Sequence, residues 1–147
     1  MTARQPRPAD RAGQLIGALV NAVLLWMVNV QPGWEAVPFL TEDTPRVLPL
    51  VNLSIAVGLL TNLVYLLNNG PRMRALGGLI TSAVGLAAAG RILQVFPLDL
   101  EEPYSTVARI LLVVAVVGSA IAIVVNLATL FTANRRTRPP VRSRTTL

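Results

Sequence analysis

The chain has no cysteine, no histidine and no lysine, so all 13 of its basic residues are arginines. These absences exclude disulfide bonds, thiol redox chemistry, zinc sites with sulfur or imidazole ligands, histidine-ligated haem and Schiff-base lysines. Serines such as Ser54, Ser82 and Ser119 have no histidine or lysine that would activate them as nucleophiles. We therefore expect no catalytic residue, no metal ligand and no cofactor, and we do not expect an enzyme.

Charged residues are also scarce: they make up 14% of the 147 residues, whereas water-soluble chains carry about 25%. Hydrophobic residues make up 53%, and the mean hydropathy is +0.59. This composition is typical of a protein whose main solvent is lipid. A net charge of +6 would suggest nucleic acid in a soluble protein. Here the arginines after residue 131 form a short tail without aromatic residues for base stacking, so we expect no nucleic-acid partner.

Prolines divide the chain into four long apolar segments, because a proline removes a helical N–H group and clashes with the preceding turn. Each segment has about 20 residues, the length that crosses a bilayer as a helix. We predict an all-α polytopic membrane protein, a four-helix transmembrane bundle with up-down topology and spans over 13–30, 47–67, 75–95 and 106–131. This transmembrane domain, 12–132, is flanked by a cytoplasmic arm over 1–11 and a disordered arginine-rich cytoplasmic tail over 133–147.

The charges divide between the two ends of the predicted bundle. Ten of the 13 arginines lie in the amino-terminal arm, the loop over 68–74 and the tail, whereas six of the seven acids lie in the other two loops. Since cytoplasmic loops carry the excess of arginine, we expect both termini in the cytoplasm and a plasma membrane location, the inner membrane of a bacterium. Three arginines depart from this rule near the outer ends of spans: Arg46, Arg91 and Arg109.

The second and fourth spans end alike, around Asn62 and Asn126. Each span follows an acidic, proline-bearing loop and an arginine at its entry, Arg46 in one case and Arg109 in the other. One interpretation is a pair of tandem helical hairpins in parallel orientation, as some transporters use. The other is that any two outer loops of a membrane protein share this composition.

Small residues recur every four positions and share a face in the spans, which lets helices approach closely in lipid. The stripe predicted to pack the helices consists of Gly13, Gly17, Gly58, Gly77, Gly85 and Gly118. In three spans it leads to an asparagine: Asn21, Asn62 and Asn126. An unpaired amide in hydrocarbon is costly, so we interpret these three as an interhelical polar clamp. The alternative is a polar site for a ligand or ion within the bundle.

Arg91 and Arg109 are charges inside predicted spans, about 7 Å below the outer interface, a depth from which long side chains reach the headgroups. Asp99, Glu101 and Glu102 lie in the loop between those two spans. The five residues predict either an ion-pair network that ties the third span to the fourth or a site for an anionic headgroup. Guanidinium groups suit the second role because they bind phosphate in a bidentate manner.

The pattern as a whole favours a non-catalytic integral membrane protein, an assembly or accessory partner in contact with membrane lipids. It would pack with itself or with a larger membrane complex through the glycine stripe of the third span, which leads to no asparagine. No acid lies inside a predicted span, although buried acids are the usual mark of proton-driven export. The alternative is a small homo-oligomeric transporter, a channel or an anionic-lipid-binding protein. A transporter requires a continuous line of polar residues through an oligomer, whereas an assembly partner requires a smooth face of small residues and an apolar core.

Three short segments carry a resemblance to a known group of proteins: 34–41 (WEAVPFLT), 47–52 (VLPLVN) and 95–99 (VFPLD). With them, residues 12–132 resemble the small four-span membrane proteins of unassigned function from GC-rich actinobacteria. The preference for arginine over lysine is similar to that group. The resemblance implies a plasma membrane location and no activity, and it carries over no catalytic residue.

Overall fold

The computed structural model describes residues 8–135, and the regular structure in that range is helical. It consists of α1 (Pro8–Asn29), η1 (Trp34–Ala36), η2 (Thr44–Arg46), α2 (Leu48–Leu67), α3 (Pro71–Val95) and α4 (Tyr104–Arg135), where η marks a short 3-10 helix. All four α-helices are long and apolar enough to cross a membrane. The predicted all-α fold with four membrane-spanning helices is therefore confirmed. The parts of the predicted arm and tail over 1–7 and 136–147 lie outside the described residues.

Three of the helices extend beyond the predicted spans where polar residues continue them. α2 agrees with the predicted 47–67 to within one residue. α3 begins at Pro71 rather than at 75, because proline fits the first turn of a helix and Arg72 and Arg74 suit the headgroup layer. α4 has 32 residues, about 48 Å of helix, whereas the hydrocarbon core is about 30 Å thick. Apolar composition thus predicts the membrane-crossing part of a helix, not its full length.

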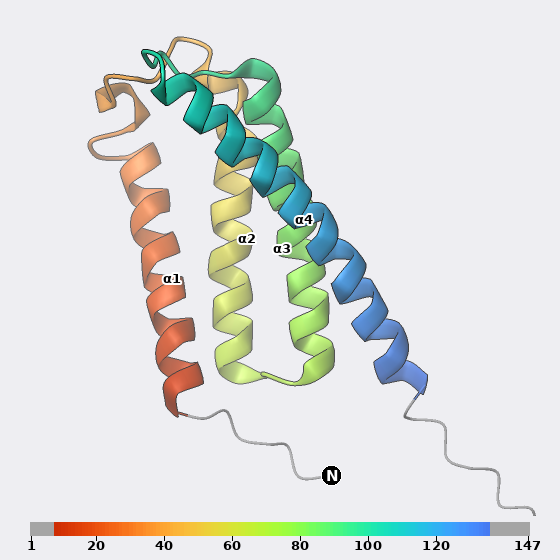
Figure 1. The fold of residues 1–147 in the computed structure, drawn as a ribbon. Helices are drawn as coiled ribbons and strands as arrows, with labels where there is room; N and C mark the ends of the chain where they lie inside the picture. Colours follow the sequence, from red (N-terminus) through yellow and green to blue (C-terminus); the bar gives the residue numbers. More distant parts are fainter. Residues whose placement is uncertain (1–7, 136–147) are drawn as a thin grey trace, which may run out of the picture.

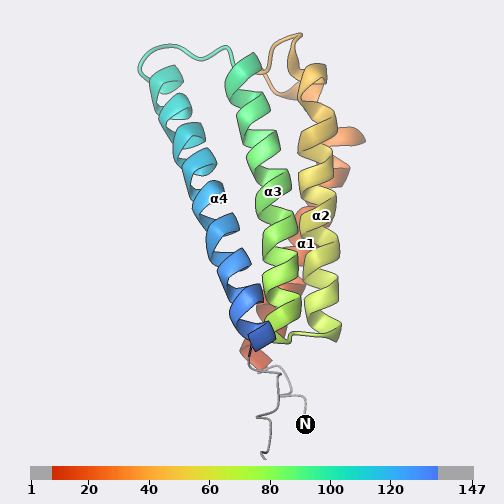
Figure 2. The same ribbon diagram turned by 90° about the vertical axis from the view of Figure 1, so that its right-hand side faces the viewer.

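Consecutive helices run in opposite directions and pack on one another, α1 on α2, α2 on α3 and α3 on α4 (Figure 1). α4 runs obliquely across its neighbours in Figure 1 and stands beside α3 in Figure 2. The two long loops, over 30–47 and 96–103, lie together at one end, which we call the acidic end because they hold six acids. The start of α1, the α2–α3 turn and the end of α4 lie at the opposite end, the basic end.

The two loops of the acidic end are joined by backbone hydrogen bonds. Leu40 and Leu98 form an isolated antiparallel β-bridge, and Thr41 N donates to Pro97 O at 3.1 Å. The bridge links the α1–α2 hairpin to the α3–α4 hairpin, in addition to the contact between α2 and α3. It holds both loops over the ends of the helices that they connect.

Phe96 ends α3 with its backbone in the left-handed region, at φ 44° and ψ 64°. Phe96 N donates to Ile92 O at 2.6 Å, which closes the last turn of the helix. This conformation costs a residue other than glycine roughly 1–2 kcal/mol. The phenylalanine side chain must therefore contribute a contact that glycine would not, and its ring indeed lies against an arginine of α4.

The four helices bury little side-chain surface among themselves. Within the described residues the buried apolar side chains are all small: Ala18, Val47, Ala75, Ala88, Ala89 and Pro97. No large side chain is fully buried there, and large apolar side chains project outward from all four helices. Soluble monomers rarely expose such continuous apolar surface. The chain is therefore an integral membrane protein whose outer surface suits lipid or other membrane helices.

Candidate functional site

Polar side chains within the four apolar helices are the candidates for a functional site, because lipid offers them no hydrogen-bonding partner. They lie in three places. The first is the pair of contacts between α1 and α2 and between α3 and α4. The second is the end of the α1–α2 pair nearest the acidic loops. The third is the region around Arg91 and Arg109.

The three predicted clamp asparagines each form a hydrogen bond with their own helix. In each case the side-chain amide donates to the backbone carbonyl four residues earlier: Asn21 to Gly17 at 2.7 Å, Asn62 to Gly58 at 2.8 Å, and Asn126 to Ala122 at 2.8 Å. The amide donors are thus used without a bond to another helix. Asn21 and Asn62 lie between α1 and α2, whereas Asn126 lies between α4 and α3. The three side chains do not meet in one cluster.

The asparagines still connect the helices, because each covers a glycine of the neighbouring helix. A Cβ atom added to that glycine would lie no more than 3.0 Å from the amide oxygen: 2.8 Å for Gly17 and Asn62, 3.0 Å for Gly58 and Asn21, and 2.7 Å for Gly78 and Asn126. Only glycine allows so close an approach. α1 and α2 exchange one asparagine–glycine contact in each direction, and α4 makes one with α3.

Gly78 is absent from the predicted stripe, although it makes one of these contacts. Adjacent residues of a helix point about 100° apart. Gly77 therefore faces α2, where the Tyr65 hydroxyl covers it, while Gly78 faces α4 and Asn126. The paired glycines allow α3 to approach both neighbours at one level. The Gly-Gly dipeptide inside an apolar helix is the sequence signal for this role.

The remaining stripe glycines have looser surroundings. Gly85 faces α4, and the nearest side-chain atom would lie 3.9 Å from an added Cβ. Gly13 and Gly118 have no atom within 4 Å of an added Cβ. The predicted stripe thus contains glycines that bring helices together within the chain and glycines that face outward. The stripe glycines of the third span belong to the first kind, so they do not form the free face expected for a partner, whereas Gly13 and Gly118 belong to the second.

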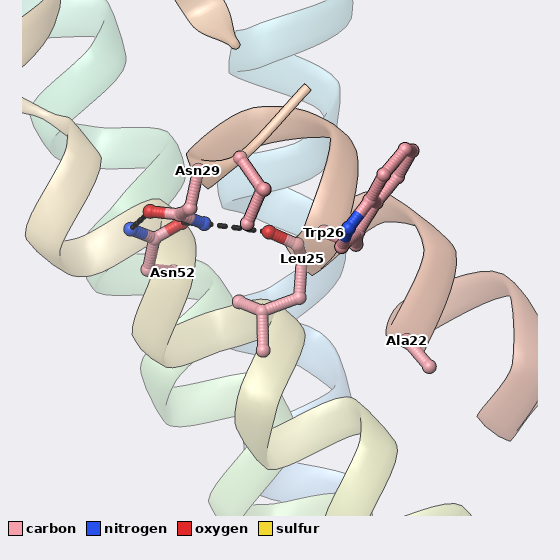
Figure 3. Close-up of a pocket in the computed structure, with 6 residues that line it drawn as sticks. Ala22, Leu25, Trp26, Asn29 and Asn52 are labelled. Carbon is pink, nitrogen blue, oxygen red and sulfur yellow. Dashed lines mark hydrogen bonds between the residues drawn. The ribbon is translucent and has the colours of Figure 1, made fainter. Parts of the chain in front are cut away.

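Asn29 and Asn52 form a pair of amides that the predicted clamp does not include (Figure 3). Asn29 Nδ2 donates to Asn52 Oδ1 at 3.0 Å, and Asn52 Nδ2 donates to Asn29 Oδ1 at 2.6 Å. Asn29 Nδ2 also donates to Leu25 O at 2.7 Å. The pair lies in a shallow groove of about 470 Å³, whose other lining is apolar and includes Trp26. In Figure 3 the indole of Trp26 points away from the two amides.

This amide pair continues the α1–α2 contact toward the acidic end. Asn29 lies eight residues after Asn21 on α1, and Asn52 lies six residues before Gly58 on α2. At 1.5 Å per residue these offsets are about 12 Å on α1 and about 9 Å on α2, close enough for the two amides to meet. An asparagine near the acidic end of each of the two spans is the sequence signal for this pair.

The three arginines of the acidic end have different surroundings. Arg46 forms an ion pair with Asp43 at 2.8 Å. Arg109 Cζ lies 4.1 Å from the centroid of the Phe96 ring, a cation–π contact between α4 and the end of α3. Arg91 is exposed and has no ion pair, hydrogen bond or ring contact with the described residues. Arg91 and Arg109 therefore differ in their contacts within the described residues.

The acids of the second loop form hydrogen bonds rather than ion pairs. The Glu102 carboxylate accepts hydrogen bonds from the hydroxyls of Ser105 and of Thr106, the latter at 2.7 Å. These bonds lower the pKa of Glu102, and the charge of Arg109 adds a smaller effect in the same direction. Asp99 takes part in the loop bridge through its backbone N–H, which donates to Phe39 O at 2.9 Å.

Neither Asp99 nor Glu101 forms an ion pair with Arg91 or Arg109 within the described part of the chain. In the same range no group of three histidine, cysteine or acidic residues is placed to hold a metal ion. No known protein family, no characterised protein and no solved structure matches this chain. The arrangement of the helices and of their polar groups is therefore the evidence for the function.

Proposed function

We propose that the chain is a non-catalytic protein of the plasma membrane that assembles side by side with other membrane-spanning helices, its own copies or those of a larger complex. The observation that carries this proposal is the outward face of α4. Gly118 lies there without any atom within 4 Å of an added Cβ, among exposed Val114, Val117 and Ile121. Small residues at the surface of a membrane helix allow a second helix to approach closely.

The polar groups of the spans support assembly better than transport. Five polar side chains of the spans each donate a hydrogen bond to a carbonyl of their own helix: Ser54, Asn62, Thr81, Asn126 and Thr129. The asparagines are also divided between two separate helix contacts. A transporter or channel needs a continuous polar path, and these residues do not form one within the described helices.

The test is the mass of the complex that the full chain forms in its own membrane. Native mass spectrometry after gentle extraction should show a species larger than the 15.7 kDa monomer. Gly118→Leu should reduce that species to the monomer, because a leucine prevents close approach of a second helix. Val114→Leu, on the same exposed face, adds one carbon to a residue that is already large and serves as the matched control. A monomer in the unaltered protein would disprove the proposal.

A further inference from the structure

Arg91 is the arginine of the acidic end that has no side-chain partner among the described residues. Arg46 has Asp43 and Arg109 has the Phe96 ring, whereas Arg91 has no contact of these kinds within the described residues. It lies four residues before the last residue of α3, about 6 Å along the helix from the acidic loops. A guanidinium at that depth in a bilayer needs a partner.

A second free polar group lies beside it. Gln94 follows Arg91 by three residues, so the two share one face of α3. Both side chains are exposed, and the Gln94 amide forms no hydrogen bond with the described residues. Toward the basic end the same face continues with exposed apolar side chains: Leu76, Ile80, Ala83 and Ala87. This face therefore has two polar donors near the end of the helix and an apolar surface of membrane depth below them.

We propose that Arg91 and Gln94 bind the phosphate of an anionic phospholipid whose acyl chains lie along this face of α3. The guanidinium offers two parallel N–H donors to phosphate oxygens, and the glutamine amide offers a third from the next turn. The arginine side chain is long enough to extend from its position to the phosphate level. The site lies in the leaflet at the acidic end and does not depend on the assembly proposed above.

A lipid fits this face better than a carboxylate on another protein helix. A buried protein carboxylate would have to meet Arg91 at one fixed depth, whereas a lipid phosphate lies at the level to which an arginine side chain near a helix end extends. The apolar residues below Arg91 also include the large side chains of Leu76 and Ile80, which suit acyl chains. The experiment below has a separate outcome for a protein carboxylate that binds Arg91.

The experiment measures which lipids the full chain retains. The chain is placed in nanodiscs of equal phosphatidylglycerol and phosphatidylcholine, and native mass spectrometry counts the lipids that stay bound. Arg91→Leu should lower the ratio of retained phosphatidylglycerol to phosphatidylcholine by about fivefold, the effect of one arginine at an anionic surface. Gln94→Leu should lower it less, and Arg91→Lys should keep part of it. Arg109→Leu is the matched control and should lower the ratio less than Arg91→Leu does, because the Arg109 guanidinium lies on the Phe96 ring.

Each other outcome overturns the proposal. An unchanged ratio in Arg91→Leu, or an equal fall in Arg109→Leu, would show that Arg91 has no specific lipid. Displacement of phosphatidylglycerol by excess inorganic phosphate would assign the site to a soluble phosphate. Loss of a bound protein without a change in the lipid ratio would assign Arg91 to a protein carboxylate. Circular dichroism establishes whether each variant folds. If Arg91→Leu does not fold, the single variants Gln94→Leu and Arg91→Lys provide the test.

Discussion

Gly78 and Gly90 are two glycines of the same helix in opposite surroundings. An added Cβ at Gly78 would lie 2.7 Å from the amide oxygen of Asn126, whereas no atom lies within 4 Å of one at Gly90. A glycine inside a helix costs about 0.5–1 kcal/mol relative to alanine. At Gly78 the missing side chain is what permits contact between α3 and α4, whereas Gly90 has no such role.

Gly78→Ala should lower the free energy of unfolding by about 1–3 kcal/mol, because Asn126 has to leave its hydrogen bond with Ala122 or the two helices have to separate. Gly90→Ala should leave it unchanged or raise it by up to about 1 kcal/mol. Reversible unfolding of the full chain in detergent micelles, followed by circular dichroism, measures both. A second substitution, Asn126→Ala, should restore part of the stability of Gly78→Ala. Equal losses of unfolding free energy in Gly78→Ala and Gly90→Ala would contradict the contact between Gly78 and Asn126.

At the scale of a helix, the first turn of α4 depends on the carboxylate of Glu102. Its hydrogen bonds from Ser105 and Thr106 hold its pKa below the ordinary value of 4.5. A carboxylate whose pKa is lowered by folding stabilises the folded state above its unfolded pKa. That contribution is lost as the pH falls through the folded pKa. The start of α4 should therefore loosen in acid.

Glu102→Gln should lower the thermal unfolding midpoint at neutral pH and make it less sensitive to acid below about pH 4.5, since glutamine does not titrate. The measurement is the midpoint by circular dichroism from neutral to acidic pH. Glu101→Gln is the matched control, because the neighbouring Glu101 carboxylate forms no hydrogen bond with the described residues. If both variants follow the pH dependence of the unaltered protein, the Glu102 carboxylate does not stabilise the first turn of α4.

At the scale of the whole molecule, the two ends of the bundle differ in charge, and we expect the basic end to face the cytoplasm. The chain has no cysteine, so single-cysteine variants are straightforward to interpret. In sealed right-side-out membrane vesicles, a membrane-impermeant maleimide added outside should label Glu35→Cys, which lies in an acidic loop. It should label Asn68→Cys, in the α2–α3 turn, only after the vesicles are opened. The reverse pattern would invert the topology.

The candidate site illustrates which properties a sequence reveals. Asn62 and Asn126 are recognisable as polar groups in apolar segments because their chain neighbours suffice to show it. Their partners are not recognisable in this way. Both side chains bond to their own helices, and the glycines that they cover lie 45 or more residues away, Gly17 for Asn62 and Gly78 for Asn126. The Asn29–Asn52 pair escaped prediction for the same reason, since Asn29 alone resembles the polar end of a span.

The sequence by itself determined that the protein has four apolar membrane-length helices and that its charges divide between the two ends. These properties depend on the length of apolar runs, on prolines and on local charge, all of which are read along the chain. The tertiary structure decided that Arg109 lies on Phe96 while Arg91 faces outward, and that the two acidic loops are bridged at Leu40 and Leu98. These contacts depend on the register and tilt of the helices, which interactions between distant residues set and no local pattern encodes.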